Sequence, residues 1–318
     1  MASSTTSVFR PGTLAFITGS ASGVGFAFAQ HCRRQGMHVA LADINSDNLE
    51  KAKAALQSIS PNTNTSTSPQ ILTYTLDVSD LSAWSRVKTD LTSKFSSINF
   101  LMLNAGMSMK PSTSSPWEDA AYFHKTLATN FFGVVHGLAT LLPLVTDTKS
   151  NSDSSGPSAI VITGSKQGIT NPPGNPAYNA SKAAVKAVAE QLAHDLRSKA
   201  PQQQVSVHLL VPGWTFTGLS GNQGPVPDEE ALNKKPHGAW LPGQVVEYGV
   251  KKINEGKFYI ICPDTDVDEA LDQARMSWAV GDIIEGRSAL SRWDDKFKDG
   301  AAKAIAEDAE RRRGGGKA

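Results

Sequence analysis

The chain has 318 residues, of which 40% are hydrophobic and 19% are charged, so it can bury a substantial core and differs from disordered and fibrous proteins. Its 31 basic and 30 acidic residues give a formal net charge of +1. This balance supplies no overall field to attract a nucleic acid or an anionic membrane, so we expect neither as a partner.

The two cysteines, Cys32 and Cys262, lie far apart in apolar surroundings and show no metal-ligand spacing. We therefore expect two buried thiols and no bound metal. No uninterrupted apolar stretch reaches the roughly 18 residues that span a bilayer, and no signal-peptide pattern precedes the first expected strand. The expected location is the cytoplasm.

Seven apolar runs, rich in β-branched residues, alternate with longer segments of helical periodicity. The runs are 13–18, 37–43, 71–77, 99–104, 158–163, 205–211 and 257–262. Their near-continuous hydrophobicity predicts strands that are covered on both faces. Strands that alternate with helices through right-handed crossovers form an open parallel sheet. The pattern therefore predicts an α/β fold, a doubly wound parallel sheet in a single domain.

The sequence also contains two polar stretches and a C-terminal extension. The Ser/Thr/Asn/Pro-rich stretches 58–70 and 146–158 are expected to be solvated loops within the domain. Residues 263–318 continue past the last run and are expected to form a helical extension of the same domain. Its apolar positions are Val267, Leu271, Met276, Trp278, Ile283 and Ile284. The basic, Gly-rich end, 309–318, is expected to fray.

The stretch TGSASGVG (18–25) follows the first run directly and opens a helix. Gly19 permits a tight turn, Gly23 lets the backbone approach a pyrophosphate, and Gly25 allows close packing of helix and strand. The N-terminus of the helix favours the phosphate charge. A glycine motif alone can also be a simple turn, so its place between a strand and a helix is what favours a dinucleotide site. The expected residues of this turn are Gly19, Ser22, Gly23, Val24 and Gly25.

Asp43 ends the second run, where an acidic side chain can hydrogen-bond the adenosine ribose hydroxyls of a dinucleotide. The same carboxylate repels a 2′-phosphate, and the flanking Ser22 and Ile44 offer no compensating cation. NAD(H) is therefore the expected cofactor, and NADP(H) is the less favoured alternative. Asp43 could instead cap the following helix, although Asn45 and Ser46 are better N-cap candidates.

The stretch YNASK (178–182) places Tyr178 and Lys182 four residues apart, on the same side of a helix. A phenol ionises near pH ~10, so a tyrosine that acts as a base at neutral pH needs a nearby cation. Lys182, helped by an oxidised nicotinamide ring, can supply that charge. Taken alone, such a pair is a common structural accident. Ser165, at the carboxyl end of the fifth run, can bind a substrate oxygen beside Tyr178, or it can simply stabilise a turn.

Several motifs together resemble the short-chain dehydrogenase/reductase family over roughly residues 10–262. In chain order they are Thr18-Gly19-x-x-x-Gly23-x-Gly25, NAG (104–106), Asn130, Ser165, YNASK (178–182) and PGWTFT (212–217). Ser165 lies 13 residues before Tyr178, which is the interval that the family uses. The family often has a second serine where this chain has Gly164. The resemblance implies a Rossmann-fold catalytic domain over 1–262, with 263–318 as an extension of it.

The resemblance also implies roles for residues in the loops that follow the strands. Asn104, Ala105 and Gly106 end the fourth run at the switch point of the sheet and should line the cofactor crevice. Asp77 and Val78 would flank the adenine, although Asp77 could instead begin the helix of 79–96. Pro212, Thr215 and Thr217 would hold the nicotinamide carboxamide, unless PGWTFT is only a turn. The implied catalytic residues are Asn130, Ser165, Tyr178 and Lys182.

Asn130 would hold a water that links Lys182 to solvent, or it could be a polar break that bonds backbone within a helix. The Gly/Pro-rich segment of about 217–245 takes the place of the family's substrate lid. The expected substrate contacts, each of which could equally belong to the core, are Met107, Met109, Gln167, Trp214, Phe216 and Trp240. These side chains suggest a bulky apolar or aromatic secondary alcohol or ketone.

The sequence thus predicts an NAD(H)-dependent alcohol dehydrogenase or ketoreductase, with Tyr178 as acid and base, that forms a homodimer or homotetramer as family members commonly do. Two alternatives stay open. One is a lyase, epimerase or cyclase on the same fold, since a fold does not dictate its chemistry. The other is a regulatory protein that senses the dinucleotide; such proteins tend to lose the tyrosine or the lysine, and both are present here.

Overall fold

The computed structural model describes residues 7–62, 69–146, 156–199 and 204–314. The two polar stretches expected to be loops, 58–70 and 146–158, lie in large part outside the described residues. So do the ends of the chain.

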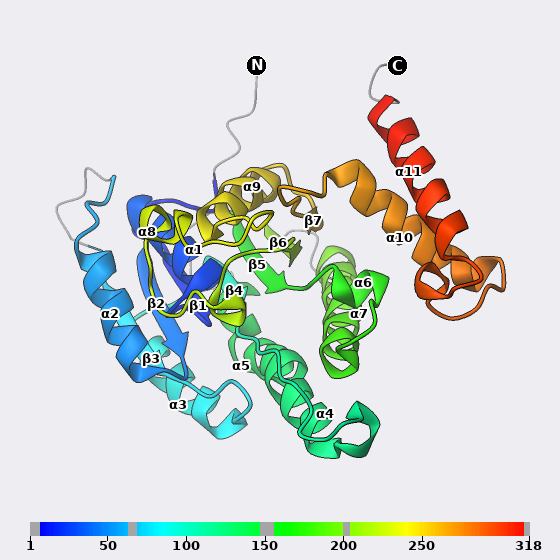
Figure 1. The fold of residues 1–318 in the computed structure, drawn as a ribbon. Helices are drawn as coiled ribbons and strands as arrows, with labels where there is room; N and C mark the ends of the chain where they lie inside the picture. The colour runs from blue at the N-terminus through cyan, green and yellow to red at the C-terminus, as the bar shows by residue number, and fades with distance from the viewer. Residues whose placement is uncertain (1–6, 63–68, 147–155, 200–203, 315–318) are drawn as a thin grey trace.

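The described residues form one parallel sheet of seven strands, drawn as arrows in Figure 1. The strands are β1 (Leu14–Thr18), β2 (His38–Asp43), β3 (Ile71–Thr75), β4 (Phe100–Leu103), β5 (Ser158–Thr163), β6 (Val205–Val211) and β7 (Tyr259–Ile261). Their order across the sheet is β3-β2-β1-β4-β5-β6-β7, and every neighbouring pair is parallel. The direction of winding reverses between β1 and β4, which creates a crevice at the carboxyl ends of these strands. The predicted strands and the doubly wound fold are confirmed.

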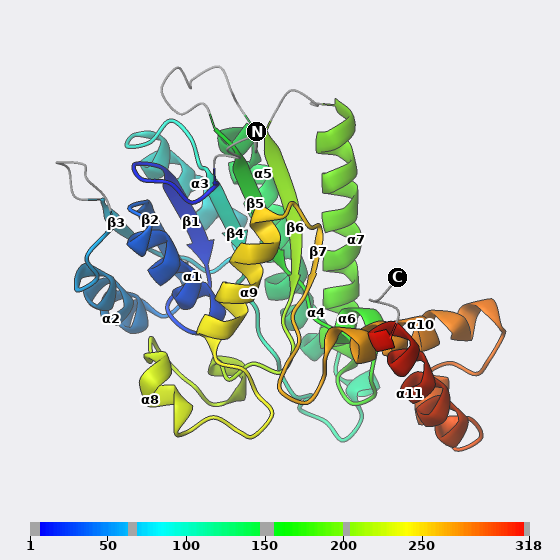
Figure 2. The same cartoon turned by 90° about the horizontal axis from the view of Figure 1, so that it is seen from above.

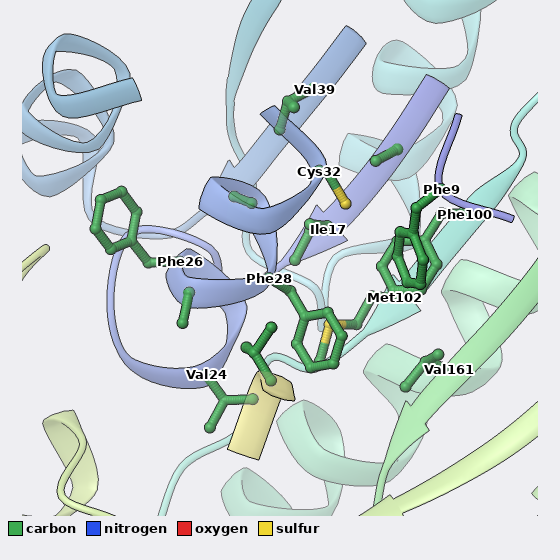
Figure 3. Close-up of a cluster of buried hydrophobic side chains, with 14 of the residues drawn as sticks. Phe9, Ile17, Val24, Phe26, Phe28, Cys32, Val39, Phe100, Met102 and Val161 are labelled. Carbon is green, nitrogen blue, oxygen red and sulfur yellow. The ribbon is translucent and has the colours of Figure 1, made fainter. Parts of the chain in front are cut away.

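Two layers of helices cover the sheet. Helices α1 (Gly23–Arg34), α2 (Ser46–Gln57) and α9 (Pro242–Asn254) pack on one face, and α3 (Leu81–Thr92), α5 (Gly133–Thr146) and α7 (Pro176–Lys199) on the other. On the first face, Phe28 of α1 stacks on Phe100 of β4 and lies beside Met102 (Figure 3). On the second, Trp84 packs against Phe16 of β1. Burial on both faces explains why the strands are hydrophobic without alternation.

The second layer contains one long, continuous apolar helix, of which α5 is the last part. It consists of α4 (Ala120–Leu127), the π-helical η2 (Ala128–Phe132) and α5. By length and composition alone it could cross a membrane. It packs closely on the sheet, because a Cβ at Gly137 would lie 2.6 Å from Leu103 Cδ2 and 3.1 Å from the Trp84 ring. We therefore interpret it as a core helix, and one such helix is weak evidence for a membrane span.

The segment that follows β6 contains η4 (Gly218–Ser220) and α8 (Asp228–Leu232), and a short η1 (Pro116–Glu118) precedes α4. Phe216, Ala231, Ala239 and Leu241 form a small buried cluster in this segment. The proposed lid therefore carries a core of its own, beside α1 and α9 (Figure 2).

The C-terminal extension contains α10 (Glu269–Ile284), η5 (Ser291–Trp293) and α11 (Lys298–Gly314), and α10 lies beside α6 (Gln167–Thr170) (Figures 1 and 2). The predicted helical extension is confirmed. The expectation that residues 309–318 fray is wrong for 309–314, which belong to α11. Their arginines find carboxylates: Arg312 Nε lies 2.8 Å from Asp308, and Arg313 Nε lies 2.7 Å from Asp268.

Candidate active site

The glycine turn joins β1 to α1 with the geometry that the sequence predicts. Gly19 and Gly23 have φ angles of +61° and +55°, a region that favours glycine. A Cβ at Gly25 would lie 2.3 Å from the carbonyl oxygen of Gly19, so only glycine fits where the helix meets the turn. The backbone of the turn is therefore exposed to a ligand, and the start of α1 points its free N–H groups the same way.

A hydrogen-bonded network holds the switch point together. The Thr18 hydroxyl oxygen accepts bonds from the backbone N–H groups of Asn104 (2.9 Å) and Ala105 (3.0 Å). The side-chain amide of Asn104 donates to the carbonyl oxygens of Thr18 and Gly19, both at 3.2 Å, and accepts from the Thr163 hydroxyl at 3.0 Å. The side-chain amide of Asn104 thus connects the carboxyl ends of β1, β4 and β5 through hydrogen bonds. Thr163 carried no signal in the sequence, because its role depends on which strands become neighbours.

Asp43 lies at the end of β2, and its carboxylate faces the glycine turn. Oδ2 accepts from the backbone N–H of Ala21 and Oδ1 from that of Asn45, each at 3.1 Å. The N-cap of α2 is Asn45, which accepts from Asn48 N at 2.9 Å. The alternative that Asp43 caps this helix is therefore wrong, and its carboxylate is held in the crevice instead.

The structure also excludes the alternative role of Asp77, which was to begin the helix that follows it. Helix α3 begins at Leu81 and is capped by Asp80, whose carboxylate accepts from Ser82 N at 2.8 Å. Asp77 therefore does not begin this helix. It turns the chain instead, since its Oδ1 accepts from the backbone N–H of Ser79 at 2.9 Å.

A cleft of about 810 Å³ opens along the carboxyl ends of the strands. It is lined by nearly all of the predicted cofactor and catalytic residues: Gly19, Ser22, Gly23, Val24, Asp43, Ile44, Asp77, Val78, Asn104, Ala105, Gly106, Ser165, Tyr178, Lys182, Pro212, Thr215 and Thr217. Of the predicted set, Gly25 and Asn130 are not among its lining residues. Gly25 lies directly beneath the turn, and Asn130 is fully buried.

The expected substrate contacts divide into two groups. Met107, Gln167 and Trp214 line the cleft. Met109, Phe216 and Trp240 do not belong to its described lining. Phe216 is buried in the cluster with Leu241, and the Trp240 ring packs edge-on against the Tyr248 ring, with centroids 6.1 Å apart. The cleft also includes Ser108, Lys166 and Leu219, which the sequence did not single out.

Tyr178 and Lys182 lie one turn apart on α7, and both face the cleft. Lys182 Nζ lies 5.8 Å from the centroid of the Tyr178 ring and donates to the carbonyl oxygen of Thr163 at 2.8 Å. Burial lowers the pKa of Lys182 to about 8. Ser165 hydrogen-bonds the phenol, and its own hydroxyl oxygen accepts from Gln167 N at 3.2 Å. The structure thus brings all three side chains together.

The acidity of Tyr178 in the protein alone is governed by its burial. Burial raises the pKa of Tyr178, and the hydrogen bond with Ser165 offsets this only in part. In the protein alone, therefore, the net effect of the surroundings is to make the phenol less acidic. The physical reason is that desolvation penalises the phenolate more than the surrounding groups favour it. In the protein alone, Tyr178 therefore holds its proton at neutral pH.

Asn130 lies in the π-helical turn η2, and its amide is fully engaged. Oδ1 accepts from Met107 N at 2.8 Å, while Nδ2 donates to Met107 O and to Ser181 Oγ, both at 3.0 Å. The alternative that Asn130 is a polar break in a helix that bonds backbone therefore describes these contacts, since both bonds to Met107 are to its backbone. A Cβ at Gly106 would lie 3.4 Å from Asn130 Oδ1 and 3.7 Å from Lys182 Nζ, so this amide stands next to the lysine. π-Helical turns often mark functional sites.

The described residues fit a dinucleotide and offer no cluster of three or more His, Cys, Asp or Glu side chains that could hold a metal. The glycine turn lines the cleft through Gly19 and Gly23, and it packs so closely on the next loop that a Cβ at Gly19 would lie 2.9 Å from Ala105 Cα. Asp43 stands at the far end, where an adenosine ribose would lie. Tyr178 and Lys182 stand at the other end, within reach of a nicotinamide ring.

Comparison with known sequences gives the family. A family model described as short chain dehydrogenase matches residues 13–226. The CLA biosynthesis dehydrogenase/reductase of Lactiplantibacillus plantarum is 25% identical over 264 residues, which cover 82% of this chain and 85% of that protein. Levodione reductase of Leifsonia aquatica is 28% identical, with 65% and 70% covered. The match with the fatty acyl-CoA reductase of Acinetobacter baylyi, 27% identical over 58% of this chain, spans only 58% of that protein's length.

Solved structures agree in fold. A short chain dehydrogenase/reductase from Burkholderia phymatum, solved in complex with NAD, superposes with a TM-score of 0.71 at 24% identity and covers 88% of this chain and 97% of its own. An alcohol dehydrogenase from Thermococcus sibiricus, complexed with 5-hydroxy-NADP, gives a TM-score of 0.60 at 21% identity, with 80% and 97% covered. With the sheet order and the matched model, these findings show that the chain belongs to the short-chain dehydrogenase/reductase family of oxidoreductases, which use a nicotinamide dinucleotide.

Proposed function

We propose that this protein is an NAD(H)-dependent oxidoreductase that interconverts a bulky, apolar or aromatic secondary alcohol and its ketone. One observation carries the proposal: Ser165, Tyr178 and Lys182 converge in the same cleft as the glycine turn and Asp43. A proton-transferring group and a dinucleotide-binding turn at the two ends of one cleft are what a hydride-transfer reaction on a carbonyl needs.

The chain's own residues supply orientation and the proton. In the direction of reduction, the carbonyl oxygen would lie between the hydroxyls of Ser165 and Tyr178. Tyr178 then gives its proton to this oxygen, and its raised pKa keeps that proton in place at neutral pH. A nicotinamide dinucleotide held by the glycine turn would supply the hydride in this direction and take it up in the reverse direction. The positive charge of Lys182, one turn away, favours the phenolate that remains.

In the direction of oxidation Tyr178 acts as a base instead of an acid, because it must accept a proton from the alcohol. In the protein alone the pKa of Tyr178 is raised, so the phenolate is scarce. The oxidised nicotinamide ring carries a positive charge that adds to that of Lys182. We therefore expect alcohol oxidation to accelerate as pH rises above neutrality, while ketone reduction stays constant until the phenol itself ionises.

Asn130 acts as a positioning residue in this proposal. Its side-chain amide hydrogen-bonds both the backbone N–H and the carbonyl oxygen of Met107. These bonds fix the loop 104–107, which forms the floor of the cleft. The family resemblance gives it a water that relays protons from Lys182. The buried position of the amide, next to Lys182 Nζ, is compatible with that relay.

One feature of the cleft supports the choice of NAD(H). The carboxylate of Asp43 stands in the cleft, held by Ala21 N and Asn45 N, where it would meet the ribose hydroxyls and repel a 2′-phosphate. A structural neighbour was solved with NAD, although another was solved with an NADP derivative, so the fold itself allows both.

The apolar lining by Met107, Trp214 and Leu219 supports a bulky apolar substrate. We also propose a cytoplasmic homo-oligomer.

The test is a panel of aromatic and polyketide-like ketones, including acetophenone and α-tetralone, assayed with NADH and with NADPH. We expect turnover with NADH to exceed turnover with NADPH for wild type. Asp43→Ser should narrow that preference by about tenfold or more, since two charges about 4 Å apart repel by about 1 kcal/mol in water and about 4 kcal/mol near a protein surface, and a factor of ten corresponds to ~1.4 kcal/mol. A wild type that prefers NADPH would contradict the assignment of Asp43. A protein that binds NADH but turns over no member of the panel would favour the non-redox alternative.

A further inference from the structure

Lys166, the residue after Ser165, lies between two carboxylates of the C-terminal region. Its Nζ lies 2.5 Å from Asp272 Oδ2 and 3.5 Å from Asp264 Oδ2. All three side chains are largely buried, with 17% of Lys166, 4% of Asp272 and 9% of Asp264 exposed. Removing one partner from a buried ion pair leaves a charge without compensation, so such clusters hold their elements firmly in place.

The cluster joins elements that lie far apart in the sequence. Asp264, which follows β7, also accepts a hydrogen bond from the backbone N–H of Trp214, after β6, at 3.1 Å. A Cβ at Gly213 would lie 2.8 Å from Asp264 Oδ2 and 3.0 Å from Lys166 Nζ, so the chain after β6 passes directly over this pair. Asp272 belongs to α10. One lysine therefore connects the loops after β5, β6 and β7 with the first helix of the extension.

Two of the connected loops carry residues that line the substrate end of the cleft. Ser165 precedes Lys166 directly, and Lys166 begins the turn of α6, since its carbonyl oxygen accepts from Ile169 N at 3.0 Å and Thr170 N at 2.9 Å. Trp214 lines the same end of the cleft. Fixing the lysine side chain thus fixes the backbone on which the Ser165 hydroxyl is mounted, and fixing Asp264 fixes the backbone of Trp214.

We propose that the Lys166–Asp264–Asp272 cluster positions Ser165 and Trp214 for the substrate, so that the C-terminal extension completes the substrate end of the active site. This inference rests on the proposed function, because it assumes that Ser165 and Trp214 meet the reacting ketone. Lys166 is a positioning residue in this account: two carboxylates engage its charge, and it acts through the loops that it holds. The dinucleotide end of the cleft, at the glycine turn and Asp43, does not depend on the cluster.

The first experiment compares Lys166→Met with Lys166→Arg, using the ketone of the panel that wild type reduces fastest. We expect Lys166→Met to lower kcat/KM by about 100-fold, because a misplacement of about 1 Å at reacting groups costs that much. The dissociation constant of NADH, measured by fluorescence, should change less than about threefold. Lys166→Arg should restore most of kcat/KM, since a guanidinium can bond both carboxylates. A general loss of folding would change both constants, and it would show in the thermal unfolding midpoint.

The second experiment asks whether the extension acts through the lysine. Asp272→Asn keeps the shape of the side chain and removes its charge, so it serves even if Lys166→Met does not fold. We expect a loss of about tenfold or more in kcat/KM, and the double variant should lose no more than Lys166→Met alone, because contacting residues are not additive. The matched control is Asp282→Asn, which breaks a buried ion pair with Arg287 wholly within the extension. It should leave kcat/KM unchanged.

The outcomes separate this inference from the proposed function. Values of kcat/KM within threefold of wild type for Lys166→Met and Asp272→Asn would overturn the positioning role, as would losses that add in the double variant or an equal loss in Asp282→Asn. Tyr178→Phe is assayed in parallel. If Tyr178→Phe is inactive while the cluster variants behave like wild type, only the inference fails. If Tyr178→Phe keeps full turnover, the proposed chemistry fails, whatever the cluster variants do.

Discussion

The sheet domain and the C-terminal extension are held together by different kinds of contact. In the sheet domain, strand residues such as Ile17, Phe100 and Val161 are completely buried between two layers of helices. Among the described residues of the extension, the buried apolar cluster consists of Ala274, Ile305 and Ala309, with Leu271 and Trp278 partly buried against it, while Ile283 and Ile284 are 86% and 77% exposed.

In the extension, polar contacts take the place of the buried apolar contacts that hold the sheet domain together. Asp282 bonds Arg287 Nε at 2.8 Å and Ser291 N at 3.0 Å, and Arg313 bonds Asp268. Elements with few buried apolar contacts open at lower free energy than core elements. Tyr178 and Lys182 therefore stand on the rigid part of the molecule, and the proposed role of the extension is to support the substrate end of the cleft from outside through Lys166. The comparison predicts large effects on stability from changes in the sheet domain and small ones from changes in the extension outside the Lys166–Asp264–Asp272 cluster.

The largest expected effect on stability in the sheet domain comes from Lys182, whose pKa burial lowers from 10.5 to about 8. Because the folded value lies below the unfolded one, the unfolded chain binds more protons between pH 8 and 10.5, and wild type gains stability as pH rises through this window. The gain is at most about 3 kcal/mol, since one pKa unit corresponds to ~1.4 kcal/mol. Lys182→Met should lack it. Urea unfolding of both proteins across this window measures the difference, and a constant difference would contradict the assignment.

The next effect concerns the glycine turn. In Gly25→Ala the new Cβ would lie 2.3 Å from the carbonyl oxygen of Gly19, which is backbone and cannot move cheaply. Overpacking of this kind costs about 1–3 kcal/mol. We expect a free energy of unfolding lower by that amount and NADH affinity weaker by about tenfold or more. Urea unfolding and a fluorescence titration measure the two, and an unchanged affinity would show that the turn does not hold the dinucleotide.

The smallest effect is expected for the matched change in the extension, Gly300→Ala. A Cβ at Gly300, in α11, meets no atom within 4 Å, and alanine favours a helix over glycine. We expect a gain of about 0.5 kcal/mol in stability, with NADH affinity as in wild type. Calorimetry together with the same titration provides the check. A loss of stability would mean that this face of α11 is covered in solution.

Much of the sheet domain could be predicted because its signals are local. Each strand is a short apolar run since both of its faces are buried, and Gly19, Gly23 and Gly25 are required by backbone geometry at fixed spacing. Tyr178 and Lys182 share one side of a helix by virtue of being four apart. Such features do not depend on which distant segments become neighbours.

The features that escaped prediction all depend on long-range packing. The partners of Lys166 follow it by about a hundred residues, and nothing in its own surroundings in the sequence marks it. The raised pKa of Tyr178 results from burial, which a spacing cannot reveal. Trp240 resembled a substrate contact because it stands in a Gly/Pro-rich segment, yet its ring packs on Tyr248. The end of α11 looked frayed because Arg313 finds its partner Asp268, 45 residues earlier in the chain, only in the folded extension.

The central claim is that the Tyr178 hydroxyl exchanges a proton with the substrate beside the nicotinamide. The most direct measurement is single-turnover consumption of NADH with a ketone substrate, for wild type and Tyr178→Phe, with NADH affinity measured alongside. The phenyl ring keeps the packing and removes only the hydroxyl. The account predicts a rate lower by about a thousandfold, within the range for loss of a general acid, at unchanged NADH affinity. A rate within tenfold of wild type would contradict it.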